Sequence, residues 1–272
     1  MSEQTPYIRR IEIESLWNGR RHVDWTLRPD VNILSGVNGV GKSTILNRVV
    51  LHLLNVNRLE RHLEGVRLTF SPRHVESLDF DVIRSFDRPA LSDETLNQIT
   101  DVHLQSELDL NLYQLQRKYL DYQVNLSNRI VALFTNMDPE AQQKAKKIAQ
   151  DKQHFQDIVD DLFKETGKTI CRDRNEIYFN SLGEVIPCYK LSSGEKQMLI
   201  ILLSVLVQNH QPYVLFMDEP EVSLHVEWQQ RLIALIRQLN PHAQIIMTTH
   251  SPAVIMDGWA ECVTDVQDIV SQ

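Results

Sequence analysis

The sequence predicts an α/β fold: a mostly parallel sheet, covered by helices on both faces, with an α-helical hairpin inserted into it. Segments of strand character alternate with segments of helix character over 31–59 and again over 194–248. Between these regions, residues 93–166 carry apolar residues at helical spacing instead. The 272 residues, 42% of them hydrophobic, are enough for one large core with length left over. We therefore expect one domain with a helical insertion.

Strands around a glycine-rich loop are expected in the first part of the chain. Apolar and polar residues alternate over 7–14, and Asn18-Gly19 is a dipeptide that favours a tight turn back into a second strand. A short apolar strand then leads directly into the glycine-rich loop, and residues at helical spacing follow it. The predicted elements are strands over 7–14, 23–27, 31–34, 66–70 and 78–83 and a helix over 44–59, with a turn around Ser71-Pro72.

The middle of the chain is predicted to be a helical hairpin. Apolar residues between Leu108 and Phe134 recur every three or four positions, Asp138-Pro139 breaks the pattern, and a second amphipathic stretch follows over 148–162. The predicted domain boundaries are thus 1–92, 93–166 and 167–272. After the hairpin we expect a β-hairpin over 176–179 and 184–186, helices over 194–208 and 223–239, strands over 213–217 and 244–248, and a short α/β tail.

Composition excludes several classes of protein. The formal charge of −8, from 36 acidic and 28 basic residues, argues against a chain coated for non-specific nucleic-acid binding. The three cysteines are odd in number and widely spaced, which suits a reducing compartment and small core residues. The longest strongly apolar stretch, 198–207, is about half of a bilayer-spanning helix. We expect a cytoplasmic protein without a membrane partner.

The glycine-rich loop has the pattern of a phosphate-binding loop. Gly36-Val37-Asn38-Gly39-Val40-Gly41-Lys42-Ser43 matches that pattern at every defined position, between a strand and a helix. Backbone N–H groups at the helix start would wrap the phosphates of ATP, Lys42 would reach the outer phosphates, and Ser43 would bind Mg²⁺. The residues predicted to bind the nucleotide here are Gly36, Asn38, Gly39, Val40, Gly41, Lys42, Ser43 and Thr44.

Two carboxylates end the apolar strand at 213–217. Asp218 and Glu219 therefore lie where a parallel sheet places its catalytic groups. We expect Asp218 to hold Mg²⁺ together with Ser43, and Glu219 to deprotonate the attacking water as general base. A buried strand with a solvated acidic turn is the alternative reading of the same residues.

The stretch Leu191-Ser192-Ser193-Gly194-Glu195-Lys196-Gln197 resembles the signature motif of the ATP-binding-cassette superfamily. The resemblance implies a P-loop NTPase with the fold of an ABC-ATPase head domain. It also implies that Ser192, Ser193, Gly194 and Glu195 contact the nucleotide held by a second protomer. An ordinary helix start is the alternative, because Ser192 and Glu195 also have the spacing of a capping box. The same residues can serve both functions, nucleotide contact and helix capping.

Two further segments resemble elements of the same superfamily. Glu221-Val222-Ser223-Leu224-His225 resembles the D-loop that crosses the dimer interface, and His250 resembles the switch histidine that senses the γ-phosphate. Together with the Ser-Gly-Glu signature, the stretch 219–225 is similar to the RecF/SMC/OLD-like (AAA_21-like) group, which includes the Septu and retron-associated ATPases of bacterial anti-phage defence. The Q-loop glutamine stays unassigned between Gln98 and Gln105.

The favoured interpretation is an ATPase that dimerises around two Mg-ATP and switches a separate effector protein, a nuclease or toxin, in anti-phage defence. We expect no second catalytic domain in the chain, and a hairpin that either docks the partner or packs on the core. The alternatives are a DNA-repair or chromosome-maintenance ATPase acting directly on nucleic acid, and a non-hydrolysing module that uses ATP as dimer glue. Trp17 or Trp25 could stack on adenine, although core packing is favoured.

Overall fold

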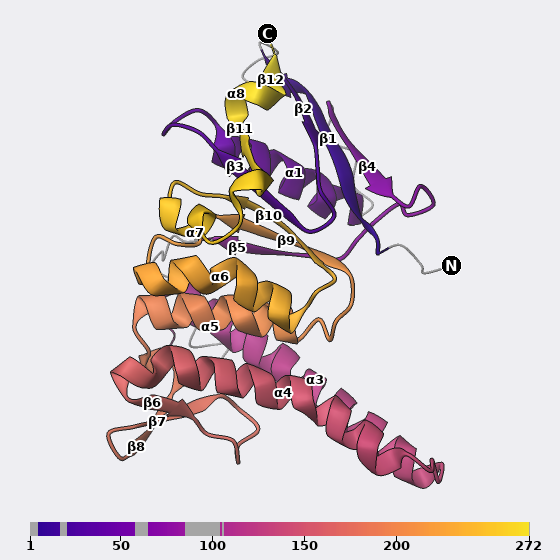
Figure 1. Cartoon of the computed structure of the whole chain (residues 1–272), viewed down its shortest axis with the longest axis vertical. Coiled ribbons are helices and arrows are strands. Elements are labelled where there is room, and N and C mark those ends of the chain that lie inside the picture. Colours follow the sequence, from indigo (N-terminus) through magenta and orange to yellow (C-terminus); the bar gives the residue numbers. More distant parts are fainter. Residues whose placement is uncertain (1–4, 17–20, 58–64, 85–103, 105, 272) are drawn as a thin grey trace. The chain divides into compact units, whose positions relative to one another are not determined.

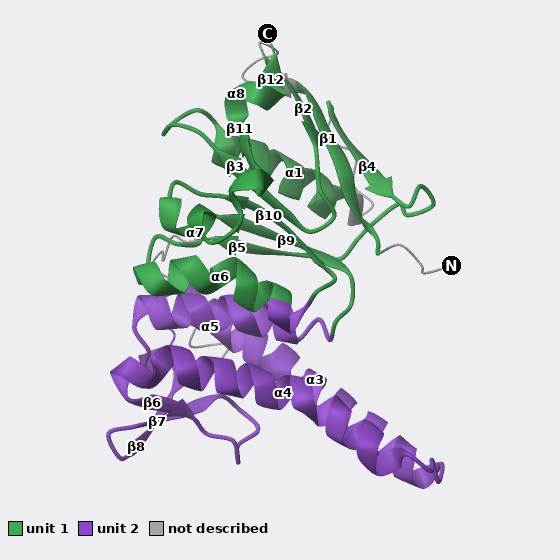
Figure 2. Ribbon diagram, in the orientation of Figure 1, with its two compact units in different colours: residues 1–85, 210–237, 241–272 green, residues 86–209, 238–240 purple. Residues whose placement is uncertain are grey.

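The computed structural model describes residues 5–16, 21–57, 65–84, 104 and 106–271 (Figure 1). The chain forms two compact units (Figure 2). Unit 1 contains residues 1–85, 210–237 and 241–272, and unit 2 contains residues 86–209 and 238–240. None of the helices in the described part of the chain combines the length and apolar character needed to span a bilayer.

A five-stranded parallel sheet forms the centre of unit 1, with the strand order β11-β3-β10-β9-β5. Strands β9 and β10 are buried along their whole length, as expected for central strands of a parallel sheet. Helix α1 lies on one face and α6 on the other (Figure 1). The elements are β3 (Val31–Ser35), α1 (Lys42–Asn57), β5 (Phe80–Arg84), β9 (Tyr213–Asp218), α6 (Val226–Leu239), β10 (Ala243–Thr248) and β11 (Val263–Asp265). The predicted parallel sheet covered on both faces is therefore confirmed.

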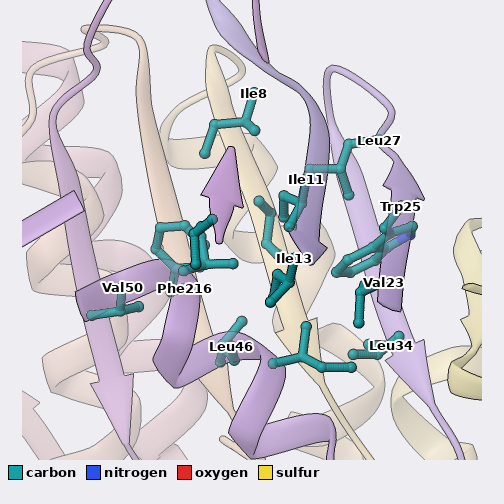
Figure 3. Close-up of a cluster of buried hydrophobic side chains, with 14 of the residues drawn as sticks. Ile8, Ile11, Ile13, Val23, Trp25, Leu27, Leu34, Leu46, Val50 and Phe216 are labelled. Carbon is teal, nitrogen blue, oxygen red and sulfur yellow. The ribbon is translucent and has the colours of Figure 1, made fainter. Parts of the chain in front are cut away.

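A second, antiparallel sheet of unit 1 has the order β12-β2-β1-β4. Its strands are β1 (Tyr7–Leu16), β2 (Arg21–Thr26), β4 (Val66–Ser71) and β12 (Val270–Ser271), and the short helices α7 (Pro252–Met256) and α8 (Val266–Ile269) complete the unit. Apolar side chains of β1 and β2 pack with α1 and with Phe216 of β9 in one buried cluster (Figure 3). The shared core fixes the glycine-rich loop, which lies between β3 and α1, relative to both sheets.

Unit 2 combines a long helical hairpin, a small sheet and helix α5. Helices α3 (Glu107–Thr135) and α4 (Ala141–Phe163) pack together through their apolar faces, and α5 (Ser193–Leu206) packs against both. The antiparallel sheet has the order β6-β7-β8, with β6 (Lys168–Ile170), β7 (Tyr178–Ser181) and β8 (Glu184–Pro187). The predicted hairpin is thus confirmed for its described residues, and it shares one compact unit with the signature segment.

Some predicted elements differ from the structure. Strands β4 and β5, predicted on either side of a turn around Ser71-Pro72, belong to different sheets, which the sequence did not show: β4 pairs with β1, and β5 pairs with β9. Helix α6 begins at Val226 instead of residue 223, because Val222 and Leu224 donate their N–H groups within turns to Glu219 and Glu221. Strand β6 was not predicted, since three residues are too short to show a period. The Asn18-Gly19 turn lies outside the described residues.

Candidate nucleotide site

The glycine-rich loop joins the carboxyl end of β3 to the first turn of α1. Gly36, Gly39 and Gly41 have positive φ angles of 150°, 79° and 105°, which side chains with a Cβ rarely adopt. A Cβ at Gly36 would also lie only 3.0 Å from Cγ1 of Val40. Residues 37–39, including Asn38, are exposed to solvent. The loop therefore presents its backbone, and few side chains, to whatever binds above it.

The first turn of α1 supplies further hydrogen-bond donors. Lys42, Ser43 and Thr44 open the helix, and the first N–H groups of a helix have no acceptor within it. These groups also lie at the positive end of the helix dipole. The arrangement suits a polyanion such as the phosphates of a nucleotide.

Lys42 folds back over the loop and ends beside His250. Its Nζ donates to the carbonyl oxygens of Gly36 at 3.0 Å and Val37 at 3.4 Å, and it contacts Nε2 of His250. Burial lowers the pKa of Lys42 from its ordinary value, and nearby carboxylates, Glu219 first among them, act in the opposite direction. An anion bound at the loop would favour the charged form of this buried ammonium.

Asp218 and Ser43 meet at the carboxyl edge of the parallel sheet. Oδ1 of Asp218 accepts hydrogen bonds from Oγ of Ser43 at 2.8 Å and from Oγ1 of Thr248 at 2.6 Å. Asp218 and Thr248 come together because they are paired in the β9–β10 register. A serine hydroxyl beside a buried carboxylate is a set of hard oxygen donors, which fits Mg²⁺. The pair predicted as metal ligands is thus brought together.

Glu219 follows Asp218 in a strained turn that aims its carboxylate at His250. Its φ angle is 48°, and its N–H donates to both the carbonyl oxygen and Oγ1 of Thr248 at 3.1 Å. Oε1 of Glu219 lies 3.1 Å from Nε2 of His250. That nitrogen also contacts Lys42, and it can accept from the ammonium or donate to the carboxylate, but not both. The tautomer of His250 therefore selects its partner.

Glu221 holds the segment that carries His250, a role that the sequence analysis missed. It is 6% exposed, and its Oε1 accepts from Oγ1 of Thr249, from the N–H of His250 at 3.1 Å and from the N–H of Ser251 at 3.4 Å. The second glutamate of Glu219-Pro220-Glu221 was the available signal, since a carboxylate in an apolar setting needs donors. Which donors it meets is not visible in the sequence.

Gln229 links the segment 249–251, which carries His250, to residues 221–225, the predicted D-loop. This side chain of α6 donates through Nε2 to the carbonyl oxygens of Glu221 at 3.2 Å and Leu224 at 2.9 Å. Its Oε1 accepts from Oγ of Ser251 at 2.6 Å. One amide therefore spans both loops and uses its donor and acceptor sides for different partners. Nothing in its sequence position on an amphipathic helix distinguishes it from Gln230.

The signature segment opens α5 in unit 2 with a complete capping box. Oγ of Ser192 accepts from the N–H of Glu195 at 3.4 Å, and Oε2 of Glu195 accepts from the N–H of Ser192 at 2.9 Å. Ser192 and Ser193 are exposed, and Gly194 is half-buried. The capping box predicted from the spacing is thus confirmed, and the exposed helix start stays available for an anion.

The carboxylate of Glu195 is enclosed within unit 2. Its Oε1 accepts from Oγ1 of Thr166 and from Nζ of Lys168, each at 2.8 Å. Burial opposes ionisation, but the hydrogen bonds from Lys168, Ser192 and Thr166 outweigh it and lower the pKa of Glu195. This carboxylate holds Ser192 in place, and the nucleotide contact predicted for Glu195 stays a prediction.

Other predicted residues have structural positions. Trp25 is 2% exposed in the core of unit 1, and its Nε1 donates to Oγ1 of Thr264 at 3.3 Å, so core packing is confirmed over adenine stacking. Cys171, Cys188 and Cys262 are free and buried, as expected. Trp17, Gln98 and Gln105 lie outside the described residues.

Known proteins share this sequence pattern. A family model described as "AAA domain, putative AbiEii toxin, Type IV TA system" matches residues 51–257, well over half of the chain. The chain is 25% identical to the Septu protein PtuA of Bacillus thuringiensis over 91% of its own length and 72% of that protein. It is 22% identical to the Septu protein PtuA of Bacillus mycoides over 90% of its length, but it spans only 38% of that relative. A retron Vc95 probable ATPase of Vibrio cholerae is 26% identical over 32% of this chain and 19% of that one.

Solved structures show the same fold. The crystal structure of an Smc head bound to the C-winged helix domain of ScpA matches with a TM-score of 0.53, at 13% identity, over 92% of this chain and 91% of that one. An Smc head with an extended coiled coil, bound to the C-terminal domain of ScpA derived from Pyrococcus furiosus, matches with a TM-score of 0.50, at 14% identity, over 93% of this chain and 92% of that one. The fold is thus that of a P-loop NTPase, an ABC-type ATPase head, and the chain belongs to the AAA-domain family described as "putative AbiEii toxin, Type IV TA system".

Proposed function

We propose that this chain hydrolyses Mg-ATP, closes as a head-to-head homodimer around two nucleotides, and switches a separate effector protein in anti-phage defence. One observation carries the proposal: Ser43, Lys42, Asp218, Glu219 and His250 converge at the carboxyl edge of the parallel sheet, beside the glycine-rich loop. Open α/β sheets bind their ligands at this edge.

Each residue at this edge has a role that its contacts support. The backbone of 36–44 would hold the phosphates, with Lys42 moving from its carbonyl acceptors to the outer phosphate oxygens. Mg²⁺, when bound by Ser43 and Asp218, would neutralise charge on the phosphates. Glu219 would orient the attacking water and take its proton. His250 would contact the γ-phosphate, since its Nε2 already lies within reach of Lys42 and Glu219.

Exposed apolar residues support the dimer. Val37, Val222, Val226 and Met256 are 69%, 59%, 51% and 79% exposed. They follow the carboxyl ends of β3, β9 and β10, which are parallel neighbours, so they belong to one edge of unit 1. Apolar surface beside a charged nucleotide site is typical of an interaction surface. In the proposed dimer, the second copy covers this edge and adds its Ser192, Ser193 and Gly194 to the γ-phosphate.

The proposals of a separate effector and of a role in defence are based on proteins of similar sequence. Two proteins named Septu PtuA match over nine tenths of this chain. We propose that the partner is a nuclease or toxin encoded beside the gene, and that the α3–α4 hairpin supplies docking surface. Its far end exposes Val131, Phe134 and Met137.

The test measures assembly and turnover together. The Glu219→Gln chain is co-expressed with its genomic neighbours and weighed by native mass spectrometry with and without Mg-ATP, and wild-type turnover is assayed in parallel. We expect an ATP-dependent dimer that carries a neighbouring protein, and wild-type turnover that Glu219→Gln lowers by about 10²- to 10⁴-fold. A monomer that Mg-ATP leaves unchanged would overturn the dimer. Turnover that rises with added DNA, and no captured neighbour, would favour direct action on DNA instead.

A further inference from the structure

We propose that Glu221 and Gln229 are positioning residues that couple the D-loop, residues 221–225, to the segment 249–251 that carries His250. The inference rests on the proposed ATPase function and deepens it by stating how contact at the dimer interface would reach the catalytic edge. Both residues belong to unit 1, and neither is among the residues assigned above to the nucleotide or the metal.

Glu221 forms hydrogen bonds directly with the segment 249–251. One carboxylate oxygen accepts from Thr249 Oγ1 and from the backbone N–H groups of His250 and Ser251. The other oxygen, Oε2, is buried and has no hydrogen-bond partner among the residues that the structure describes. A buried carboxylate held on one side only costs free energy. A positioning role explains this cost: the carboxylate places three donors and moves with the D-loop.

Gln229 adds a second connection between the same two loops. Its Nε2 holds two D-loop carbonyl oxygens, of Glu221 and Leu224, and its Oε1 holds Oγ of Ser251. Because Gln229 sits in the first turn of α6, its own backbone is anchored by the helix. A displacement of either D-loop carbonyl therefore reorients the amide, and the amide in turn displaces Ser251, next to His250.

The D-loop has the exposure that such a coupling needs. Val222 is 59% exposed within it, and Val226 is 51% exposed directly after it, whereas Glu221 and Leu224 are buried. A second copy pressing on the exposed valines would act on the buried carbonyls behind them. The imidazole of His250 contacts both Lys42 and Glu219. Contact at the dimer interface would thus set the position of His250, the histidine that faces the γ-phosphate in the proposed dimer.

Three substitutions distinguish the hydrogen bonds of Gln229 to the D-loop from its hydrogen bond to Ser251. Gln229→Glu removes both donors to the D-loop and keeps an acceptor for Ser251. Ser251→Ala removes the link to Gln229 and also the cap that Ser251 provides to Ala253 at 3.2 Å. Gln230→Glu, on the next residue of the same helix and exposed to solvent, is the matched control for the added charge.

We expect Gln229→Glu to lower kcat about tenfold while KM for ATP stays within about twofold, and the two lost hydrogen bonds to lower the melting temperature only modestly relative to Gln230→Glu. The double variant Gln229→Glu/Ser251→Ala should turn over no more slowly than the slower single variant, because both cut one connection. Strictly additive losses, or a kcat equal to that of Gln230→Glu, would overturn the coupling. If Glu219→Gln leaves turnover unchanged as well, the proposed ATPase function fails, and not the coupling alone.

A readout independent of turnover tests Glu221. Amide hydrogen exchange of His250 and Ser251 should quicken by about tenfold or more in Glu221→Ala, and much less in Glu221→Gln, whose amide oxygen keeps the acceptor. Exchange over β9 should stay unchanged in both variants. Equal exchange at His250 and Ser251 in wild type and Glu221→Ala would refute the role of this carboxylate, and quickened exchange throughout unit 1 would show that it only stabilises the fold.

Discussion

Replacing Lys168 with methionine should destabilise the unit that carries the signature segment. Glu195 is 2% exposed, and Nζ of Lys168, with its side chain 17% exposed, donates to Oε1 of Glu195 at 2.8 Å. Methionine keeps the length and apolar stem of the lysine side chain but removes the charge and the donor. The substitution leaves a buried carboxylate with one strong partner fewer.

The size of the effect follows from the other partners. Removing one member of a fully buried ion pair costs about 3–5 kcal/mol. Glu195 retains Oγ1 of Thr166 and both groups of Ser192 as donors, so we expect a loss of about 2 kcal/mol in the free energy of unfolding. Lys164→Met is the matched control: its pair with Asp161 has side chains 65% and 42% exposed, and such surface pairs contribute about 0–1 kcal/mol.

Urea unfolding of both variants at several pH values measures the difference. The pKa of Glu195 is lowered in the folded chain, so its stabilising contribution is present above its unfolded pKa and is lost as the pH falls through the folded value. The gap between Lys168→Met and wild type should therefore be full at neutral pH and shrink below about pH 4. Equal stability of the two lysine variants at neutral pH, or a gap that acid leaves unchanged, would refute this reasoning.

Two further predictions concern the nucleotide edge. Lys42→Met should weaken ATP binding by about tenfold or more in a direct binding assay. Because burial lowers the pKa of Lys42, the affinity of the wild-type chain for ATP should begin to fall at a lower pH than it would with an ordinary lysine. The Lys42→Met variant should show no such fall. Thr248→Val removes the donor at 2.6 Å to Asp218, and should lower the free energy of unfolding by about 1–2 kcal/mol and raise the Mg²⁺ concentration needed for half-maximal turnover; an unchanged Mg²⁺ requirement would count against Asp218 as a metal ligand.

The sequence predicted those parts of the fold and site that depend on local chemistry. The glycine-rich loop needs positive φ angles at Gly36, Gly39 and Gly41, which only glycine adopts freely, so eight residues of sequence are enough to recognise its pattern. The capping box of Ser192 and Glu195 is likewise a property of one helix turn. The central strands β9 and β10 were found because both faces of a parallel sheet are buried and leave continuous apolar runs.

Tertiary structure decided which of these local groups meet. Thr248 reaches Asp218 only through the β9–β10 register, and Glu221 reaches 249–251 across a turn, a helix and a strand. Pairing of β12 with β2 and the inward turn of Glu195 toward Lys168 are equally non-local. The physical reason is that a hydrogen bond depends on distance in space, whereas periodicity and motif spacing report only distance along the chain. The sequence by itself therefore determined the chemical groups of the candidate site, and the fold alone determined their partners.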